Sequence, residues 1–174
     1  MVKRGMFLLL FLAAFGAGCS GGTPASEAEA ACQEFLEAYA QGDNPTVARL
    51  LGLPEDSAQL GELQTALARR AEWELEEPET GEEMTRVPAV ITNVDVEAVL
   101  ESLPAEIASQ AEAREALLAA FQAEDVPMRE FPVELELQEG ADGWQLVMTP
   151  ALSDALLGGY PSLMNRLLEE GETP

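Results

Sequence analysis

The sequence contains no histidine, and only nine Lys and Arg residues stand against 32 Asp and Glu residues. Without imidazole, a Ser-His-Asp triad, a Cys-His pair and a histidine metal site are all excluded. The net charge of −23 repels phosphate backbones and anionic headgroups. The chain also has no G-x-x-x-x-G-K-[ST] loop for nucleotide phosphates. We therefore expect no nucleic-acid partner, no ATP-driven chemistry and no bound cofactor.

Cysteine is almost as scarce, with only Cys19 and Cys32 in the whole chain. Two cysteines are too few for a disulfide framework or a thiolate metal cluster. Cys32 falls on the apolar face of an expected helix, which favours a small buried side chain over a reactive thiol. Cys19 stands in a different context, at the end of a long apolar run.

The first residues have the plan of a signal peptide. Lys3 and Arg4 precede an uncharged stretch, residues 5–18, that is rich in Leu and Phe. A helix of that length spans about 21 Å, at about 1.5 Å per residue, against a hydrocarbon core of about 30 Å. The run is thus too short for a comfortable transmembrane helix, and we expect residues 1–18 to be removed.

The segment from Phe15 to Gly22 resembles the cleavage box of bacterial lipoproteins, with small residues, a Cys and then a flexible polar tether. Gly16 stands where that family commonly has Leu. In such lipoproteins the Cys thiol receives diacylglycerol, and long acyl chains such as palmitate hold the protein on the membrane. The resemblance implies an exported protein, anchored by lipid on Cys19 at the extracytoplasmic face of the cell membrane. The alternative is an ordinary secreted protein in which Cys19 is incidental.

Beyond the signal peptide, the length is enough for one domain with a real core. We expect a tether at residues 19–26, a single domain at residues 27–170 and a short tail at residues 171–174. The domain retains every acidic residue but loses Lys3 and Arg4 with the signal peptide. Contact with a membrane would therefore have to come from the lipid.

The first half of the domain predicts three helices followed by two strands. Ser26 and Glu29 have the spacing of a capping box, and apolar residues follow at helical spacing. Pro88, within the second strand, suggests a sheet edge or a bulge. The three expected helices are residues 27–40, a short helix that begins at Asn44, and residues 55–70. One expected strand lies around Trp73, and the other covers residues 85–92.

The second half predicts two helices, a β-hairpin and terminal helices. Asn93 to Asp95 is expected to stop the preceding strand, with Asp95 as a helix cap. Alternating apolar and acidic residues predict a strand at residues 131–138, joined through a Gly-containing link to a partner at residues 144–149. Four helices are expected in this half. One follows Asp95, one runs from Pro104 to about residue 123, one begins at Pro150, and the last covers residues 162–170.

This order predicts an α+β fold, with N-terminal helices packed on a curved, mainly antiparallel sheet and a helical insertion between strand pairs. Five sequence segments support this prediction: Ala31–Asp43, Val47–Leu51, Ile91–Asp95, Asp142–Leu146 and Ala155–Gly159. They resemble small bacterial lipoproteins of unknown function in the cone-shaped superfamily named for nuclear transport factor two. The resemblance implies a cone-like fold with a pocket between sheet and helices.

The same resemblance suggests where a pocket could lie. Isomerases and dehydratases of the cone-shaped superfamily use an Asp or Tyr in the pocket, for which Tyr39, Tyr160 and Asp95 are candidates here. Each also has a simpler interpretation: Tyr39 as a core residue, Tyr160 as a linker residue and Asp95 as a helix cap. Trp73 and Trp144 could stack on a ligand or fill the core. The possible pocket residues are thus Tyr39, Trp73, Trp144 and Tyr160, and none is assigned as catalytic.

The many carboxylates have a simple interpretation as a solvated surface. They gather on the expected wet faces of strands, and the chain lacks the D-x-[DN]-x-[DN]-G loop that organises calcium ligands. No metal site is therefore assigned. The residues concerned are Glu72, Glu74, Glu76, Glu77, Glu79, Glu82, Glu83, Glu134 and Glu136.

The function that fits these observations best is a non-catalytic, membrane-anchored lipoprotein. Its pocket or acidic face would bind a small ligand, a wall component or another envelope protein. One alternative is a pocket enzyme, similar to an isomerase, dehydratase or hydrolase, that uses a carboxylate and a Tyr. Another is a structural spacer of the envelope with no ligand.

Overall fold

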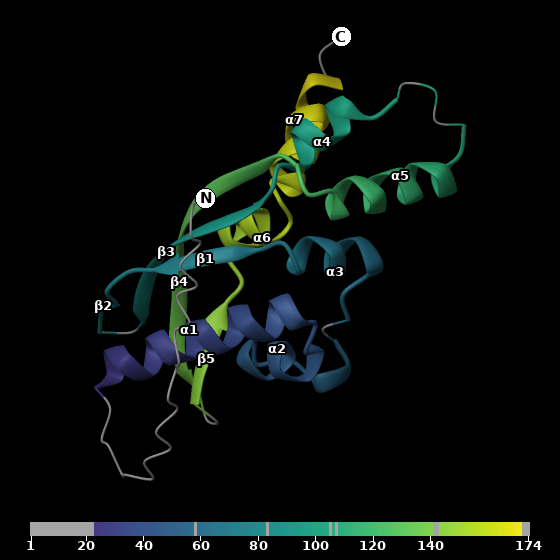
Figure 1. Cartoon of the computed structure of the whole chain (residues 1–174). Helices are drawn as coiled ribbons and strands as arrows, with labels where there is room; N and C mark the ends of the chain where they lie inside the picture. The colour runs from purple at the N-terminus through teal and green to yellow at the C-terminus, as the bar shows by residue number, and fades with distance from the viewer. Residues whose placement is uncertain are drawn as a thin grey trace, which may run out of the picture.

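The computed structural model describes residues 23–57, 59–82, 84–104, 106, 108–140 and 143–171. Within these residues the chain is α+β, with helices packed around an open antiparallel sheet (Figure 1), as the sequence predicts. The signal peptide and Cys19 lie outside the described residues. In the part that is described, none of the helices combines the length and apolar character needed to cross a membrane.

Helix α1 (Pro24–Gln41) begins earlier than expected. Thr23 caps it by accepting a hydrogen bond from the backbone N–H of Ser26, and Pro24 takes the first turn, where its missing N–H costs nothing. The capping box expected at Ser26 is therefore wrong. Gly42 ends the helix with φ of 72°, a left-handed conformation that glycine adopts without strain.

The single helix expected over residues 55–70 is also wrong. After α2 (Asn44–Leu50) the chain forms a short 3₁₀ helix, η1 (Glu55–Ser57), and then α3 (Glu62–Ala68). Glycine in a helix interior costs about 1 kcal/mol, and Gly61 instead serves as the N-cap of α3. Its N–H donates to the side-chain oxygen of Gln64 at 2.8 Å, which closes the first turn.

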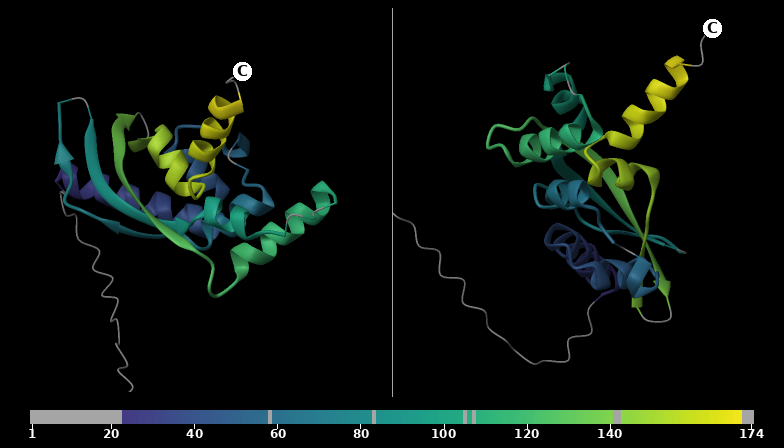
Figure 2. Two further views of the ribbon diagram at one scale, coloured as in Figure 1. Left: turned by 90° about the horizontal axis from the view of Figure 1, so that it is seen from above. Right: turned by 90° about the vertical axis from the view of Figure 1, so that its right-hand side faces the viewer.

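The sheet has the order β1-β3-β4-β5, with β2 beside β3, and all pairs are antiparallel. Its strands are β1 (Glu72–Leu75), β2 (Glu79–Thr80), β3 (Thr85–Val94), β4 (Met128–Gly140) and β5 (Gly143–Val147). The long strands β3 and β4 curve together (Figure 2). Pro88 lies on the inner strand β3 and not at a sheet edge, at the register where β1 gives way to β2. Its carbonyl accepts from the N–H of Glu76 at 2.8 Å, just beyond the end of β1, and without an N–H it donates no ladder bond in return.

The helical insertion lies between β3 and β4 and consists of α4 (Val96–Ser102) and α5 (Gln110–Gln122). Asp95 caps α4 as expected, because its carboxylate accepts from the N–H of Ala98 at 3.2 Å. The helix expected from Pro104 begins only at Gln110. Ser109 caps it there by accepting from the N–H of Glu112 at 3.2 Å.

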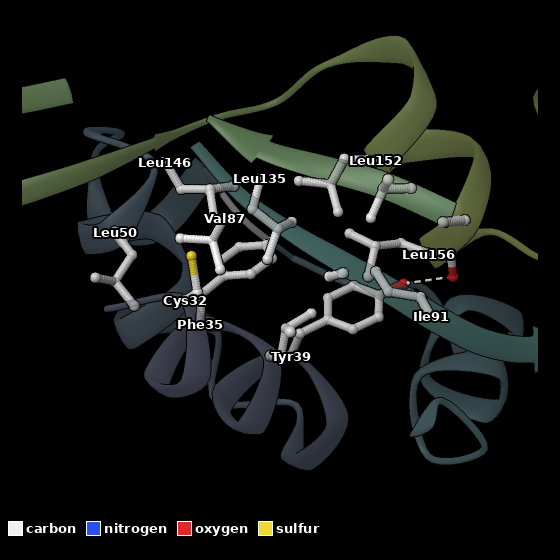
Figure 3. Close-up of a cluster of buried hydrophobic side chains, with 14 of the residues drawn as sticks. Cys32, Phe35, Tyr39, Leu50, Val87, Ile91, Leu135, Leu146, Leu152 and Leu156 are labelled. Atoms are coloured by element: carbon white, nitrogen blue, oxygen red, sulfur yellow. Dashed lines mark hydrogen bonds between the residues drawn. The ribbon is translucent and has the colours of Figure 1, made fainter. Parts of the chain in front are cut away.

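The main core lies between α1, the sheet and α6 (Pro150–Leu156) (Figure 3). A second, smaller cluster packs α3, the end of β3, α4 and α5 together. Beyond α6, the last helix α7 (Tyr160–Gly171) extends away from the rest of the fold (Figure 2). The main cluster includes Cys32, Phe35, Tyr39, Val87, Ile91, Leu135, Leu137, Leu152 and Leu156.

Candidate ligand-binding site

Tyr39, a candidate pocket residue, is part of the core. It is 4 % exposed, and its phenol donates a hydrogen bond to the carbonyl oxygen of Leu156 at 3.0 Å. Burial raises the pKa of the Tyr39 phenol well above its ordinary value of 10.0, because the phenolate would lose its water. The phenol therefore keeps its proton at neutral pH and acts as a structural donor.

Asn93 is a buried polar residue that the sequence analysis missed. It was expected to stop β3, but the strand continues to Val94 and the Asn93 side chain turns into the core with no exposed surface. Its amide nitrogen donates to the carbonyls of Ala155 and Leu156, at 3.2 and 3.0 Å, and its oxygen accepts from the Val94 N–H at 2.8 Å. Asn93 thus holds the end of α6 against β3. The one sequence signal for this role is that a polar residue occupies a core-facing position at the end of the apolar alternation of β3.

The two tryptophans lie on strands at different positions of the sheet. Trp73, on β1, is half-buried and donates from its indole N–H to the side chain of Gln33 at 3.0 Å. Trp144, on β5, is half-buried and lines a surface hollow beside Arg49 and Gln145. Both pack against the main core. The structure therefore does not bring Trp73 and Trp144 together.

Two hollows contact the remaining candidates, one for each tyrosine. The first, here called the core-side hollow, has a volume of about 380 Å³ and lies between α1, α2, η1, α3 and β5. Tyr39 and Phe35 form its floor, Leu53 and Met148 lie at exposed positions of its rim, and its polar wall consists of Ser57, Gln59 and Gln64.

The second, here called the α3–α5 groove, has a volume of about 330 Å³ and is walled by α3, α4, α5 and the start of α7. Tyr160 lines it and is 45 % exposed. Among the described residues that line it, Gln64 and Tyr160 are polar, and none carries a carboxylate, thiol or cationic group. The other lining residues are Leu63, Leu67, Val96, Leu100, Leu117, Phe121 and Leu157.

Two ion pairs connect the helices that form this groove. Arg114 of α5 pairs with Glu62 of α3, and Arg166 of α7 pairs with Glu97 of α4. All four side chains are at least one-third exposed, so each pair adds little stability. Each of these two arginines therefore has a carboxylate partner.

The geometry of the groove favours binding over chemistry. Buried apolar walls with a few polar groups are typical of small-molecule sites, whose volumes run from about 300 to 1,000 Å³. General acid–base catalysis needs a titratable group near neutral pH, and the part of the groove lining that the structure describes contains no carboxylate or imidazole. Asp95, the third catalytic candidate, caps α4 with its carboxylate.

Two carboxylates of β4 lie on the sheet face opposite the main core. Glu134 and Glu136 alternate with core residues, and both face Arg86 of β3, at 3.8 and 3.5 Å. This arrangement fits the expected solvated surface. Among the described residues, no group of three or more acidic or cysteine side chains is placed to hold a metal ion.

Comparison of the chain with models of known protein families, with curated proteins and with solved structures gives no match. The α3–α5 groove therefore has to be interpreted from its own residues.

Proposed function

We propose that this chain is an exported, lipid-anchored binding protein that takes a small, uncharged, mainly apolar ligand in the α3–α5 groove and carries out no reaction on it. The observation that carries the proposal is the lining of that groove. Seven apolar side chains surround a partly enclosed space, with the side chains of Gln64 and Tyr160 as its polar groups. Such a lining gains free energy by removing apolar ligand surface from water, at about 25 cal/mol per Å².

The non-catalytic part of the proposal rests on the three residues that could have served an enzyme. The Tyr39 phenol already donates a hydrogen bond to the Leu156 carbonyl, and the Asp95 carboxylate already accepts one at the N-terminus of α4. Tyr160 lines the groove, but none of the described residues of the groove wall has an acidic or basic side chain to act as its proton partner. A hydrogen-bonding role for Tyr160 toward the ligand requires no such partner.

The lipid anchor rests on the sequence around Cys19. Its test is the full chain expressed in a bacterium, compared with Cys19→Ala. We expect the wild type in the membrane fraction with acyl chains detected on Cys19 by mass spectrometry, and the variant released from it. Equal membrane retention of both proteins, without acyl chains, would rule out the anchor.

The groove is tested with a neutral, apolar fluorescent probe, N-phenyl-1-naphthylamine. We expect saturable binding to the full chain carrying Cys19→Ala, which has no acyl chains to take up the probe, and a loss of at least about tenfold in affinity when Leu100→Trp is added at the 36 % exposed rim of the groove. The matched control is Leu168→Trp, on α7 at 64 % exposure, which should bind as wild type does. If wild type fails to bind the probe, the structural spacer becomes the better hypothesis.

A further inference from the structure

Gln64 is the residue that the two hollows share. It lines the core-side hollow and also the α3–α5 groove, since it lies on α3 between them. The two spaces differ in character. The groove has Leu63, Leu67 and other apolar side chains around Gln64, whereas the core-side hollow adds the hydroxyl of Ser57 and the amide of Gln59.

The hydrogen bond at the start of α3 fixes which end of the Gln64 amide is free. The Gly61 backbone N–H can only donate, so the Gln64 atom 2.8 Å away must be the oxygen. The amide N–H₂ group is then the end that Gln64 can present to a ligand. A group that meets it must accept a hydrogen bond, as a carbonyl or ester oxygen does.

The charges around the two hollows further restrict the class of ligand. No cationic side chain is found among the described residues that line either hollow, and Arg114 and Arg166 beside the groove are paired with glutamates. A carboxylate or phosphate entering the groove would lose water without gaining a counter-ion, in a chain that already carries a net charge of −23. An anionic amphiphile is therefore disfavoured and a neutral one is favoured.

From these observations we infer that the ligand is a neutral acyl ester with a hydroxylated head. Its acyl chain lies in the α3–α5 groove, its ester carbonyl accepts from the Gln64 N–H₂ group, and its hydroxyls reach Ser57 and Gln59 in the core-side hollow. This inference rests on the proposed binding function of the groove and adds the class of ligand to it.

The test uses 1-monoacylglycerols, from hexanoyl to dodecanoyl, to displace N-phenyl-1-naphthylamine from the full chain carrying Cys19→Ala, so that no detergent is needed. Each added CH₂ buried in the groove should tighten binding about fourfold until the groove is full. The fatty acid of equal chain length should bind at least about tenfold more weakly at neutral pH, because it is a carboxylate there.

The decisive variant is Gln64→Glu. A glutamate at this position keeps an oxygen for the Gly61 N–H, which preserves the cap of α3, but replaces the N–H₂ donor with a second acceptor. We expect monoacylglycerols to bind about tenfold more weakly and to lose more affinity than the naphthylamine probe, which makes no hydrogen bond to Gln64, while the melting temperature stays the same. Met148→Trp, at the 44 % exposed rim of the core-side hollow, should weaken monoacylglycerols and spare the probe.

The outcomes separate this inference from the proposed function. Binding of the naphthylamine probe without displacement by any monoacylglycerol overturns the ester ligand and leaves the groove as an apolar site. Equal affinity for fatty acid and monoacylglycerol, or full affinity in Gln64→Glu, also overturns it. Absence of probe binding to the wild type overturns the proposed function itself.

Discussion

The phenol of Tyr39 and the carbonyl of Leu156 meet at 3.0 Å, although 117 residues separate them in the chain. The bond ties the end of α6 to α1 across the main core (Figure 3). The same carbonyl also accepts from the Asn93 amide at 3.0 Å, so one acceptor joins three elements of the fold. The two donors should therefore depend on each other.

Tyr39→Phe should lower the free energy of unfolding by about 1 kcal/mol, the usual net value of one hydrogen bond. The loss stays small because Asn93 still satisfies the Leu156 carbonyl. Urea denaturation of wild type and variant measures it. A loss above about 3 kcal/mol would contradict the view that the carbonyl keeps a partner.

Tyr39→Phe should also change the response to alkali. The pKa of Tyr39 is raised in the folded chain, so above about pH 10 the unfolded chain releases this proton before the folded chain does. Tyr39 thus contributes stability that is complete below pH 10 and declines as the pH rises further. The melting temperature of the wild type should therefore fall more steeply with rising pH in this range than the melting temperature of Tyr39→Phe.

Asn93→Ala should destabilise the fold more than Tyr39→Phe does, by about 3 kcal/mol. The change removes the two bonds that the Asn93 amide nitrogen donates to the Ala155 and Leu156 carbonyls, although Tyr39 still donates to Leu156. It also removes the acceptor for the Val94 N–H, and buried polar groups without partners cost about 1–3 kcal/mol each. Asn165→Ala, at an exposed site on α7, is the matched control and should change stability by less than about 0.5 kcal/mol. Equal effects of the two substitutions would show that the Asn93 bonds contribute nothing.

Gly158→Ala should be among the most damaging single changes. Gly158 has φ of 62°, and a Cβ atom there would lie 2.2 Å from the Val94 carbonyl oxygen and 2.8 Å from the Val96 side chain. Gly42→Ala provides the control, since its φ of 72° is similar but its Cβ would meet open space. We expect about 1–2 kcal/mol of backbone strain at Gly42, and a larger loss, above about 3 kcal/mol, at Gly158. Similar melting temperatures for the two variants would contradict the steric argument.

Cys32 should resist thiol reagents until the chain unfolds. Its side chain has no exposed surface, and burial, with a smaller contribution from Glu29, raises its pKa from 9.0 to about 12. The unfolded chain therefore loses the thiol proton first, so the stability that Cys32 contributes is complete below about pH 9 and is lost as the pH rises toward about 12.

The labelling experiment uses Cys19→Ala, so that Cys32 is the remaining thiol. Reaction with a maleimide at neutral pH should follow the rate of unfolding and accelerate in urea. Rapid labelling in buffer without denaturant would mean that the thiol is accessible in the folded chain.

The sequence predicts the fold well where local signals and burial agree. Cys32, Phe35 and Tyr39 recur at helical spacing and form the inner face of α1, and the apolar alternation of residues 131–138 marks the inner face of β4. The α+β class and the helical insertion are confirmed for this reason. Helix starts are predicted less accurately, because Thr23 and Ser109 compete with other capping residues nearby and only tertiary packing decides between them.

The candidate site was harder to predict than the fold. The α3–α5 groove forms where α3, α4, α5 and α7 meet, so its lining depends on contacts between segments far apart in the sequence. Of the four possible pocket residues, Tyr160 lies in this groove and Tyr39 lines the core-side hollow. Gln64 carried no signal in the sequence, since its role follows from its bond to Gly61 and from the break in the expected helix before α3.

The edges of the sheet have a consequence for how two copies of the chain would meet. On one side the outer strands are β1 and β2, with four and two residues, and Glu72, Glu74 and Glu79 on them are exposed. On the other side β5 has five residues, and α6 contacts β4 beyond it. The border formed by β1 and β2 is short and negatively charged, so it repels an identical border. The uncharged β5 border is also short and offers a neighbouring strand few free backbone groups. The sheet is thereby protected from edge-to-edge polymerisation where many copies are crowded together.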